Sequence, residues 1–310
     1  MAVTGVLRPG YIQLRVLDMG KALTHYVDHL GLSKVSEEAD GRVYLKAWDE
    51  FDRHSVILKE AASPGFDVMG FKVASDADLD AFAKRLTDDG LTVDEVAAGE
   101  QPGLGRRIGF MLPSGHRIEL FAEIEMAAEH PPVVNPDVYP NGKMPHGMKA
   151  IRFDHALLYG PNVDEVNRIF TECLDFRLAE YVELDDQGHK MAVWLTCSMK
   201  AHDIAFVLHE EPGKFHHAAF FLENWNDIGN AADIITCNDI SLDIGPTRHG
   251  ITRGQTIYFF DPSGNRNEVF AGGYTYYPDN PTRKWSLDQI GKGIFYYDRK
   301  LNDAFLSVLT

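Results

Sequence analysis

An internal repeat constrains the fold of this chain more than any other feature of its sequence. Residues 107–121 and 256–270 both contain Pro-Ser-Gly-x-Arg-x-Glu, and the second copy lies 149 positions after the first. Earlier in each half, at an offset of 142 to 144, an alternating strand pattern at residues 11–16 and 153–158 comes before a helical pattern. Because self-similarity at a fixed spacing indicates repeated structural units, we predict that the chain is a duplication.

Two amphipathic helices are expected in each half. Their apolar residues recur at intervals of three and four, which is the spacing of one helix face. Asp18 is placed to cap the first helix of the first half, and Asn162 with Glu165 resembles a capping box at the matching helix of the second half. The four apolar stripes consist of Ala22, Leu23, Tyr26, Val27 and Leu30; of Leu79, Phe82 and Leu86; of Val163, Val166, Ile169, Phe170 and Cys173; and of Trp225, Ile228, Ala232 and Ile235.

The segments between these helices alternate between apolar and polar residues, which predicts strands. They include residues 43–48, 55–59, 192–196 and 204–208. Each half therefore contains two units of a strand, a helix and further strands. A curved, mostly antiparallel sheet with the helices on its outside is the simplest way to bury the apolar faces of both.

The repeats also predict how the chain divides. We expect a first duplicated domain, a proline-rich linker, a second duplicated domain and a tail, over residues 1–123, 124–150, 151–270 and 271–310. The tail has several aromatic residues and then a helical pattern of apolar residues between Leu287 and Val308. Such a helix outside the repeat either caps the core or contacts another subunit, and the pattern leaves both interpretations open. A role of the tail aromatics as a lid is a third, less favoured interpretation.

Composition limits the environment and the partners of the chain. Its 46 acidic and 30 basic side chains give a formal net charge of −16, which repels nucleic acid and anionic membranes. Three cysteines are too few for a disulfide framework. Neither a signal peptide nor an apolar run long enough to cross a membrane is recognisable. A cytoplasmic protein that binds neither nucleic acid nor membrane is therefore expected.

The two halves differ at two positions that can carry chemistry. His155 in the second half takes the place of Gln13 in the first, and His217 takes the place of Val68. Positions that serve only the scaffold should be alike in both copies, so a histidine pair present in one half indicates a site there. Both halves keep the glutamate of the repeat.

Strand alternation places the two histidines and a glutamate on inner faces. His155 shares a face with Phe153 and Leu157, and His217 shares a face with Ala219 and Phe221. Glu268 follows the Pro-Ser-Gly turn, on the same face as Phe270. His216 is expected to point the other way. Two imidazoles and one carboxylate on one face of an ion are typical of non-haem Fe(II) sites. Because Glu119 is kept in the half without histidines, a structural role for these residues remains an open alternative.

Longer motifs carry a resemblance to a known family. They are Phe-Asp-His at residues 153–155, His-His-Ala-Ala-Phe at 216–220, and Gly-Pro-Thr-Arg-His-Gly at 245–250, which leads into Tyr-Phe-Phe-Asp-Pro-Ser-Gly-Asn-Arg-Asn-Glu at 258–268. With these motifs the chain resembles the extradiol ring-cleaving dioxygenases of the vicinal-oxygen-chelate superfamily, more narrowly those that act on catechol. The likeness extends over nearly the whole length.

The resemblance implies an α+β fold of the vicinal-oxygen-chelate type. Four βαβββ modules would pair into two duplicated domains with curved mixed sheets, and only the C-terminal domain would hold metal. A homotetramer is also implied. By motif, the metal ligands would be His155, His217 and Glu268, and the metal Fe(II), with Mn(II) as an alternative that the same ligand set accepts.

The resemblance further implies roles for three other residues. His202 matches an acid/base histidine, and His249 and Tyr258 match residues that hydrogen-bond the substrate oxygens. The alternatives are that His249 orders its loop and that Tyr258 is a core residue. The reaction implied is extradiol (meta) cleavage of catechol or a simple substituted catechol by O2, giving a 2-hydroxymuconic semialdehyde in the degradation of aromatic compounds. We expect the remaining histidines on the surface or in loops: His25, His29, His54, His116, His130, His146, His189 and His209.

Two other functions are compatible with this type of fold, because a fold alone does not fix a reaction. One is a glyoxalase-like or epimerase-like enzyme that uses Zn²⁺, Ni²⁺ or Co²⁺ for proton transfer, with Gln13 and Glu119 as further ligands. The other is a module that sequesters an aromatic ligand without catalysis. The first half has no histidine at these positions, which argues against the isomerase-like enzyme. A ligand-sequestering module would have no need for two histidines and a glutamate.

Overall fold

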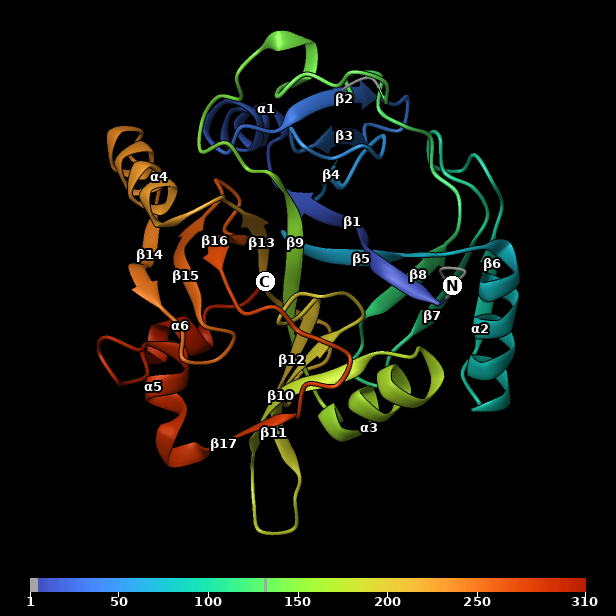
Figure 1. Cartoon of the computed structure of the whole chain (residues 1–310), viewed down its shortest axis with the longest axis vertical. Coiled ribbons are helices and arrows are strands. Elements are labelled where there is room, and N and C mark those ends of the chain that lie inside the picture. Colours follow the sequence, from blue (N-terminus) through green and yellow to red (C-terminus); the bar gives the residue numbers. More distant parts are fainter. Residues whose placement is uncertain (1–4, 131–132) are drawn as a thin grey trace.

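The computed structural model of the chain describes residues 5–130 and 133–310 (Figure 1). The first four residues, and Pro131 and Pro132 of the expected linker, lie outside the described residues. The first half contains β1 (Val6–Val16), α1 (Met19–Leu23), η1 (Thr24–His29), β2 (Ser33–Glu37), β3 (Val43–Lys46), β4 (Val56–Glu60), β5 (Gly65–Val73), α2 (Asp76–Asp88), β6 (Val93–Val96), β7 (Arg107–Met111) and β8 (Arg117–Phe121).

The second half repeats this order after a short 3-10 turn, η2 (Pro140–Gly142). It contains β9 (Arg152–Gly160), α3 (Val163–Arg168), η3 (Ile169–Cys173), β10 (Arg177–Glu183), β11 (Lys190–Thr196), β12 (Ile204–Leu208), β13 (Lys214–Phe221), α4 (Trp225–Cys237), β14 (Leu242–Arg248), β15 (Gly254–Phe260) and β16 (Arg266–Gly272). The tail adds β17 (Arg283–Ser286), η4 (Leu287–Gln289), α5 (Ile290–Ile294) and α6 (Asp303–Ser307).

Each half forms one sheet from two βαβββ modules. The strand orders are β2-β3-β4-β1-β5-β8-β7-β6 and β14-β15-β16-β13-β9-β12-β11-β10-β17. Within a module the first strand pairs in parallel with the last, as β9 does with β12. The first strands of the two modules pair antiparallel in the middle of each sheet. Both sheets are therefore mixed, which confirms the fold that the resemblance implies. The division into domains at the expected residues stays a prediction.

The helices lie on the outside of the sheets, with α2 and α4 on opposite sides of the molecule (Figure 1). Helix α2 begins after Ser75, whose side chain accepts a hydrogen bond from the backbone N–H of Asp78, and it buries the expected stripe of Leu79, Phe82 and Leu86. One continuous apolar cluster joins both halves. No helix among the described residues is long and apolar enough to cross a membrane.

Two local predictions about helices are wrong. Asn162 does not cap α3 with its side chain, because its backbone has φ 62°, a left-handed conformation, whereas a capping residue is normally extended. Its side-chain amide donates instead to the carbonyl of Pro113. The single tail helix is replaced by η4, α5 and α6. Gly291 and Gly293 favour a short helix there, and Arg299 takes a left-handed conformation that a continuous helix does not contain.

Three histidines expected on the surface or in loops are buried: His25, His54 and His116. The Nε2 atom of His25 lies 2.8 Å from Asn267 Oδ1, and the Nε2 atom of His116 lies 3.0 Å from the carbonyl oxygen of Lys214. Both contacts join the first half to the second. The sequence did not predict them because their partners lie far away along the chain.

Candidate metal centre

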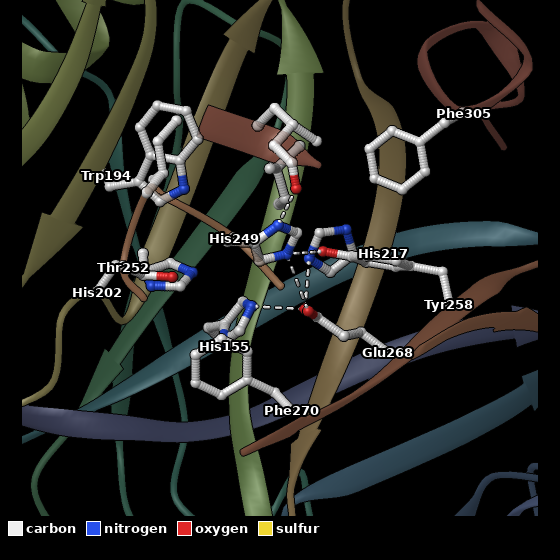
Figure 2. A pocket seen from close by; sticks show the side chains of 13 residues that line it. His155, Trp194, His202, His217, His249, Thr252, Tyr258, Glu268, Phe270 and Phe305 are labelled. Carbon is white, nitrogen blue, oxygen red and sulfur yellow. Dashed lines mark hydrogen bonds and ion pairs between the residues drawn. The ribbon is translucent and has the colours of Figure 1, made fainter. Parts of the chain in front are cut away.

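The candidate metal centre lies on three neighbouring strands of the second sheet. His155 comes from β9, His217 from β13 and Glu268 from β16, and β13 lies between the other two. His155 and Glu268 both stand opposite Ala219 in the strand register, so only a methyl group separates them there. All three side chains are buried, and their ligand atoms lie within 4.8 Å of one another (Figure 2).

The spacing of these atoms fits a divalent metal ion. Glu268 Oε2 lies 3.0 Å from His155 Nε2 and 3.1 Å from His217 Nε2. Two ligand atoms with bonds of about 2.1 Å, roughly at right angles around one ion, lie about 3 Å apart. Two imidazoles and a carboxylate on one face are the donor set of non-haem iron sites and leave the opposite positions open. The side chains present therefore fit an ion of this class.

A buried carboxylate orients His155. Its Nδ1 atom lies 2.9 Å from Asp154 Oδ2, which leaves Nε2 to face the centre. Asp154 in turn contacts Arg152 at 3.0 Å and Lys200 at 3.4 Å. Burial disfavours the charged carboxylate, but Lys200, His155 and Arg152 together outweigh it and hold the pKa of Asp154 well below its usual range. A carboxylate behind a metal-binding histidine fixes its ring and raises its basicity.

A second histidine orients His217, and its position corrects the sequence prediction. His216 does not point away from His217, because the two Nδ1 atoms lie 2.7 Å apart. The pairing of β13 with β9 shifts between Phe215 and His217, so an extra residue is inserted there as a β-bulge. The extra residue breaks the strict alternation on which the prediction was based.

Glu268 is held on its other side as well. Thr256 donates its hydroxyl hydrogen to Glu268 Oε1 at 2.5 Å, and His249 Nε2 lies 3.6 Å from the same oxygen. Burial disfavours the carboxylate, but hydrogen bonds to His155 and His217 outweigh it, so the pKa of Glu268 lies well below its ordinary value. The glutamate is therefore available as an anionic ligand.

His202 stands beside His155, from the loop between β11 and β12. The centroids of the two imidazole rings are 3.9 Å apart. Burial, followed by the charges of His155 and Lys200, lowers the pKa of His202 well below its ordinary value. The ring is therefore neutral near pH 7 and can accept a proton. Asp203 anchors the loop by accepting hydrogen bonds from the backbone N–H groups of Cys197 and Ser198.

His249 and Tyr258 form a hydrogen-bonded pair close to Glu268 (Figure 2). His249 Nδ1 lies 2.5 Å from the carbonyl oxygen of Ile294, which can only accept, so this nitrogen carries the hydrogen. The Nε2 atom therefore accepts from the hydroxyl of Tyr258 at 2.7 Å. Burial and the charge of Glu268 raise the pKa of Tyr258 well above its ordinary value, so the hydroxyl keeps its proton.

Apolar side chains form the walls around these polar groups. Trp194 and Phe305 stand on opposite sides of the imidazoles, and Phe270 lies beside His155 (Figure 2). Leu157, Ile251, Thr252 and Ile294 complete the lining. Nothing in the sequence assigned these residues to the site. Phe305 belonged to the apolar pattern of the tail, but nothing in that pattern indicated that the tail reaches the centre.

The corresponding place in the first half holds an ion-pair network instead. Glu119 Oε2 lies 2.9 Å from Arg107 Nε, and Oε1 lies 3.0 Å from Arg117 Nε. The hydroxyl of Tyr11 donates to the same carboxylate. Gln13 donates to Asp67. Since Arg107, Arg117 and Tyr11 already bind the carboxylate of Glu119, this glutamate is not free to join a metal site, which argues against its use as a ligand from the first half.

Comparisons with known proteins agree with this geometry. Residues 66–125 match the catechol 2,3-dioxygenase-like N-terminal domain, and residues 152–269 match the glyoxalase/bleomycin resistance protein/dioxygenase superfamily. The chain is 51% identical to metapyrocatechase of Pseudomonas sp. (strain CF600) over 307 residues, which are 99% of each chain. The chain is an extradiol ring-cleaving dioxygenase of the catechol 2,3-dioxygenase type.

Other members of this dioxygenase family are also similar over most of their length. The 2,3-dioxygenase LapB from Pseudomonas sp. KL28 superposes with a TM-score of 0.89 at 48% identity and covers 93% of this chain and 99% of its own. Manganese-dependent 2,3-dihydroxybiphenyl 1,2-dioxygenase of Geobacillus genomosp. 3 is 29% identical over 93% of this chain and 92% of its own. This similarity favours a dioxygenase over the isomerase-like and ligand-sequestering alternatives.

Proposed function

We propose that this dioxygenase uses Fe(II) to cleave catechol, or a simple substituted catechol, with O2 at the bond beside one hydroxyl group. The product is a 2-hydroxymuconic semialdehyde, which carries both atoms of O2, so the reaction consumes no external reductant. The arrangement of His155, His217 and Glu268 at the centre of an apolar-walled pocket carries the proposal. Full-length similarity to a metapyrocatechase supports the substrate class.

We assign the metal to His155, His217 and Glu268. Bound Fe(II) mediates electron transfer between a singlet catechol and triplet dioxygen, and it lowers the pKa of a coordinated phenol. Mn(II) is the alternative metal, because the ligand set accepts either ion and one relative is named as manganese-dependent. A homotetramer is proposed from the family resemblance and is tested by the mass of the protein in solution.

The remaining polar groups act on substrate and protons. His202 is neutral and buried, so we assign to it the acceptance of a proton from substrate and its later return during O–O cleavage. Tyr258 keeps its proton, and His249 Nε2 accepts its single hydroxyl hydrogen in the absence of substrate. We assign to Tyr258 the donation of this hydrogen to a substrate oxygen in place of His249 when catechol binds. The apolar walls clamp the ring and exclude water, which strengthens these hydrogen bonds.

Oxygen uptake tests this proposal directly. Anaerobically handled protein loaded with Fe(II) is given catechol while the visible spectrum is recorded. We expect one O2 consumed per catechol and a yellow ring-opened product. His217→Ala should lose bound metal, whereas Val68→Ala, at the matching position of the first half, should keep it. Verified bound iron without uptake on any simple catechol would refute the proposed reaction, and a metal-free wild-type protein would refute the ligand assignment.

A further inference from the structure

The imidazole of His216 joins two parts of the molecule that lie far apart in sequence. Its Nδ1 atom contacts His217 Nδ1, and its Nε2 atom lies 2.9 Å from the carbonyl oxygen of Phe305, in α6 of the tail. The ring is buried between Tyr159, stacked at 5.0 Å between centroids, and the ring of Phe305 at 4.6 Å. Both nitrogens of His216 are therefore committed.

The hydrogen positions in this chain of contacts follow from its two ends. A carbonyl oxygen only accepts, so His216 carries its hydrogen on Nε2 and donates it to Phe305. His216 Nδ1 is then an acceptor, which favours the tautomer of His217 with its hydrogen on Nδ1. At the other end Glu268 also only accepts, and it favours the tautomer with the hydrogen on His217 Nε2. A metal ion bound at Nε2 takes the lone pair of that atom, so the hydrogen must then lie on Nδ1, where His216 accepts it. The tail carbonyl thus favours the tautomer of His217 that can bind a metal.

Residues 302–310 at the end of the tail are docked by few other polar contacts. Thr310 exchanges two backbone hydrogen bonds with Phe215, at 2.8 and 3.1 Å, and its hydroxyl donates to Asn265 Oδ1 at 3.2 Å. Arg266 Nη1 donates to the carbonyl oxygen of Val308 at 2.8 Å. These contacts place the side chain of Phe305 in the wall of the metal pocket. The buried ring of Phe305 also packs against Tyr258 and Phe295. One further hydrogen bond to this short segment should change the population of its opened state measurably.

We propose that His216 is a positioning residue that couples metal binding at His217 to docking of the C-terminal segment, residues 302–310. Metal at Nε2 polarises the His217 ring and strengthens its Nδ1–H as a donor, and His216 passes this on to the carbonyl of Phe305. Metal occupancy therefore favours closure of the Phe305 wall, and docking favours metal binding by the same factor. The inference rests on the metal site proposed above.

The other imidazole provides an internal comparison. His155 is oriented by Asp154, whose partners are Arg152 and Lys200, and none of these contacts reaches the tail. Loss of either orienting partner should weaken metal binding, because partners behind a ligand tune its affinity. Only loss of His216 should make docking of residues 302–310 independent of metal binding. Asp154→Asn is therefore the matched control variant.

Amide hydrogen exchange of the intact protein measures the coupling. The metal-free protein is compared with protein saturated with Mn²⁺, and Mn²⁺ binding is verified by the loss of the free-ion EPR signal. We expect Mn²⁺ to slow exchange in residues 302–310 of the wild type about three- to tenfold, the effect of one hydrogen bond. Residues of α4, on another side of the sheet, should not change.

The variants separate coupling from a purely structural role. His216→Phe keeps a ring between Tyr159 and Phe305 but removes both hydrogen bonds, so Mn²⁺ should no longer slow exchange in the tail. His216→Gln keeps one donor and one acceptor and should restore part of the effect. If His216→Phe does not fold, the comparison of His216→Gln with the wild type tests the coupling instead. Asp154→Asn should retain the tail response once Mn²⁺ saturates it.

The outcomes distinguish this inference from the function on which it rests. If the wild type binds no Mn²⁺, and no Fe²⁺ under anaerobic conditions, the metal site itself is wrong. Should it bind metal with no change in tail exchange, the coupling is wrong while the site stands. An equal response in wild type and His216→Phe would show that another contact carries the coupling and would overturn the role of His216.

Discussion

Replacing Lys200 with methionine should disturb the proposed metal ligand His155 and the proposed acid/base residue His202 at once. The ammonium group of Lys200 lies 3.0 Å from Asp203 Oδ1 and 3.4 Å from Asp154 Oδ1, and it also donates to the backbone carbonyl of Asp154. Asp154 orients His155, and Asp203 anchors the loop that carries His202. The substitution keeps the length of the side chain but removes the charge that holds these two elements together.

The magnitude follows from what each carboxylate retains. Removing one partner of a buried ion pair typically costs about 3–5 kcal/mol. Asp203 keeps its bonds from two backbone N–H groups, and Asp154 keeps Arg152. We therefore expect the free energy of unfolding to fall by about 2–3 kcal/mol, below the usual range. A displacement of His202 by about 1 Å should lower kcat on the order of 100-fold.

Denaturant unfolding and oxygen uptake on catechol measure the two effects. Lys190→Met is the matched control: this lysine is 20% exposed, close to the 22% of Lys200, and pairs at 2.9 Å with the half-exposed Asp164, away from the centre. It should change kcat little. Lys200→Arg should recover part of the activity. If Lys200→Met and Lys190→Met had the same kcat, the lysine would not connect the two elements and the reasoning would be refuted.

Three further predictions concern other parts of the molecule. His202→Ala should keep its bound metal but lose most turnover, as metal content and oxygen uptake will show. His116 is neutral in the folded state, where burial lowers its pKa to about 4 from 6.5. As pH falls, the unfolded chain takes up a proton at His116 before the folded chain does. The free energy of unfolding should therefore fall by about 2 kcal/mol between pH 7 and pH 5 because of this residue. His116→Gln should make the free energy of urea unfolding less dependent on pH over that range. The double variant Gln13→His and Val68→His should still bind one metal ion per chain, because Arg107 occupies the carboxylate of the first half.

Each of these has a clear contrary result. Normal turnover by His202→Ala would remove its acid/base role. An unchanged pH dependence in His116→Gln would show that other groups dominate acid destabilisation. Two metal ions per chain in the double variant of the first half would mean that the ion pairs around its glutamate do not block coordination.

The sequence alone determined the repeated architecture and the candidate ligands. The repeat and the strand and helix periodicities depend on neighbours a few residues apart, so they are visible without a structure. His155, His217 and Glu268 stood out because the two halves can be compared position by position. Motif resemblance added His202, His249 and Tyr258, and their arrangement around the centre is compatible with the proposed roles.

Only the tertiary structure decided which side chains surround these residues. One inserted residue in β13 turned His216 toward His217, against the alternation that otherwise holds. Phe305 reaches His216 in the wall of the pocket, and His116 reaches Lys214, across separations of 89 and 98 residues. Such contacts depend on bulges, loop lengths and the packing of one sheet on another, and short-range patterns in the sequence do not contain this information. The comparison of the two halves thus identified the strands that carry the candidate ligands, while long-range packing decided what holds these side chains in place.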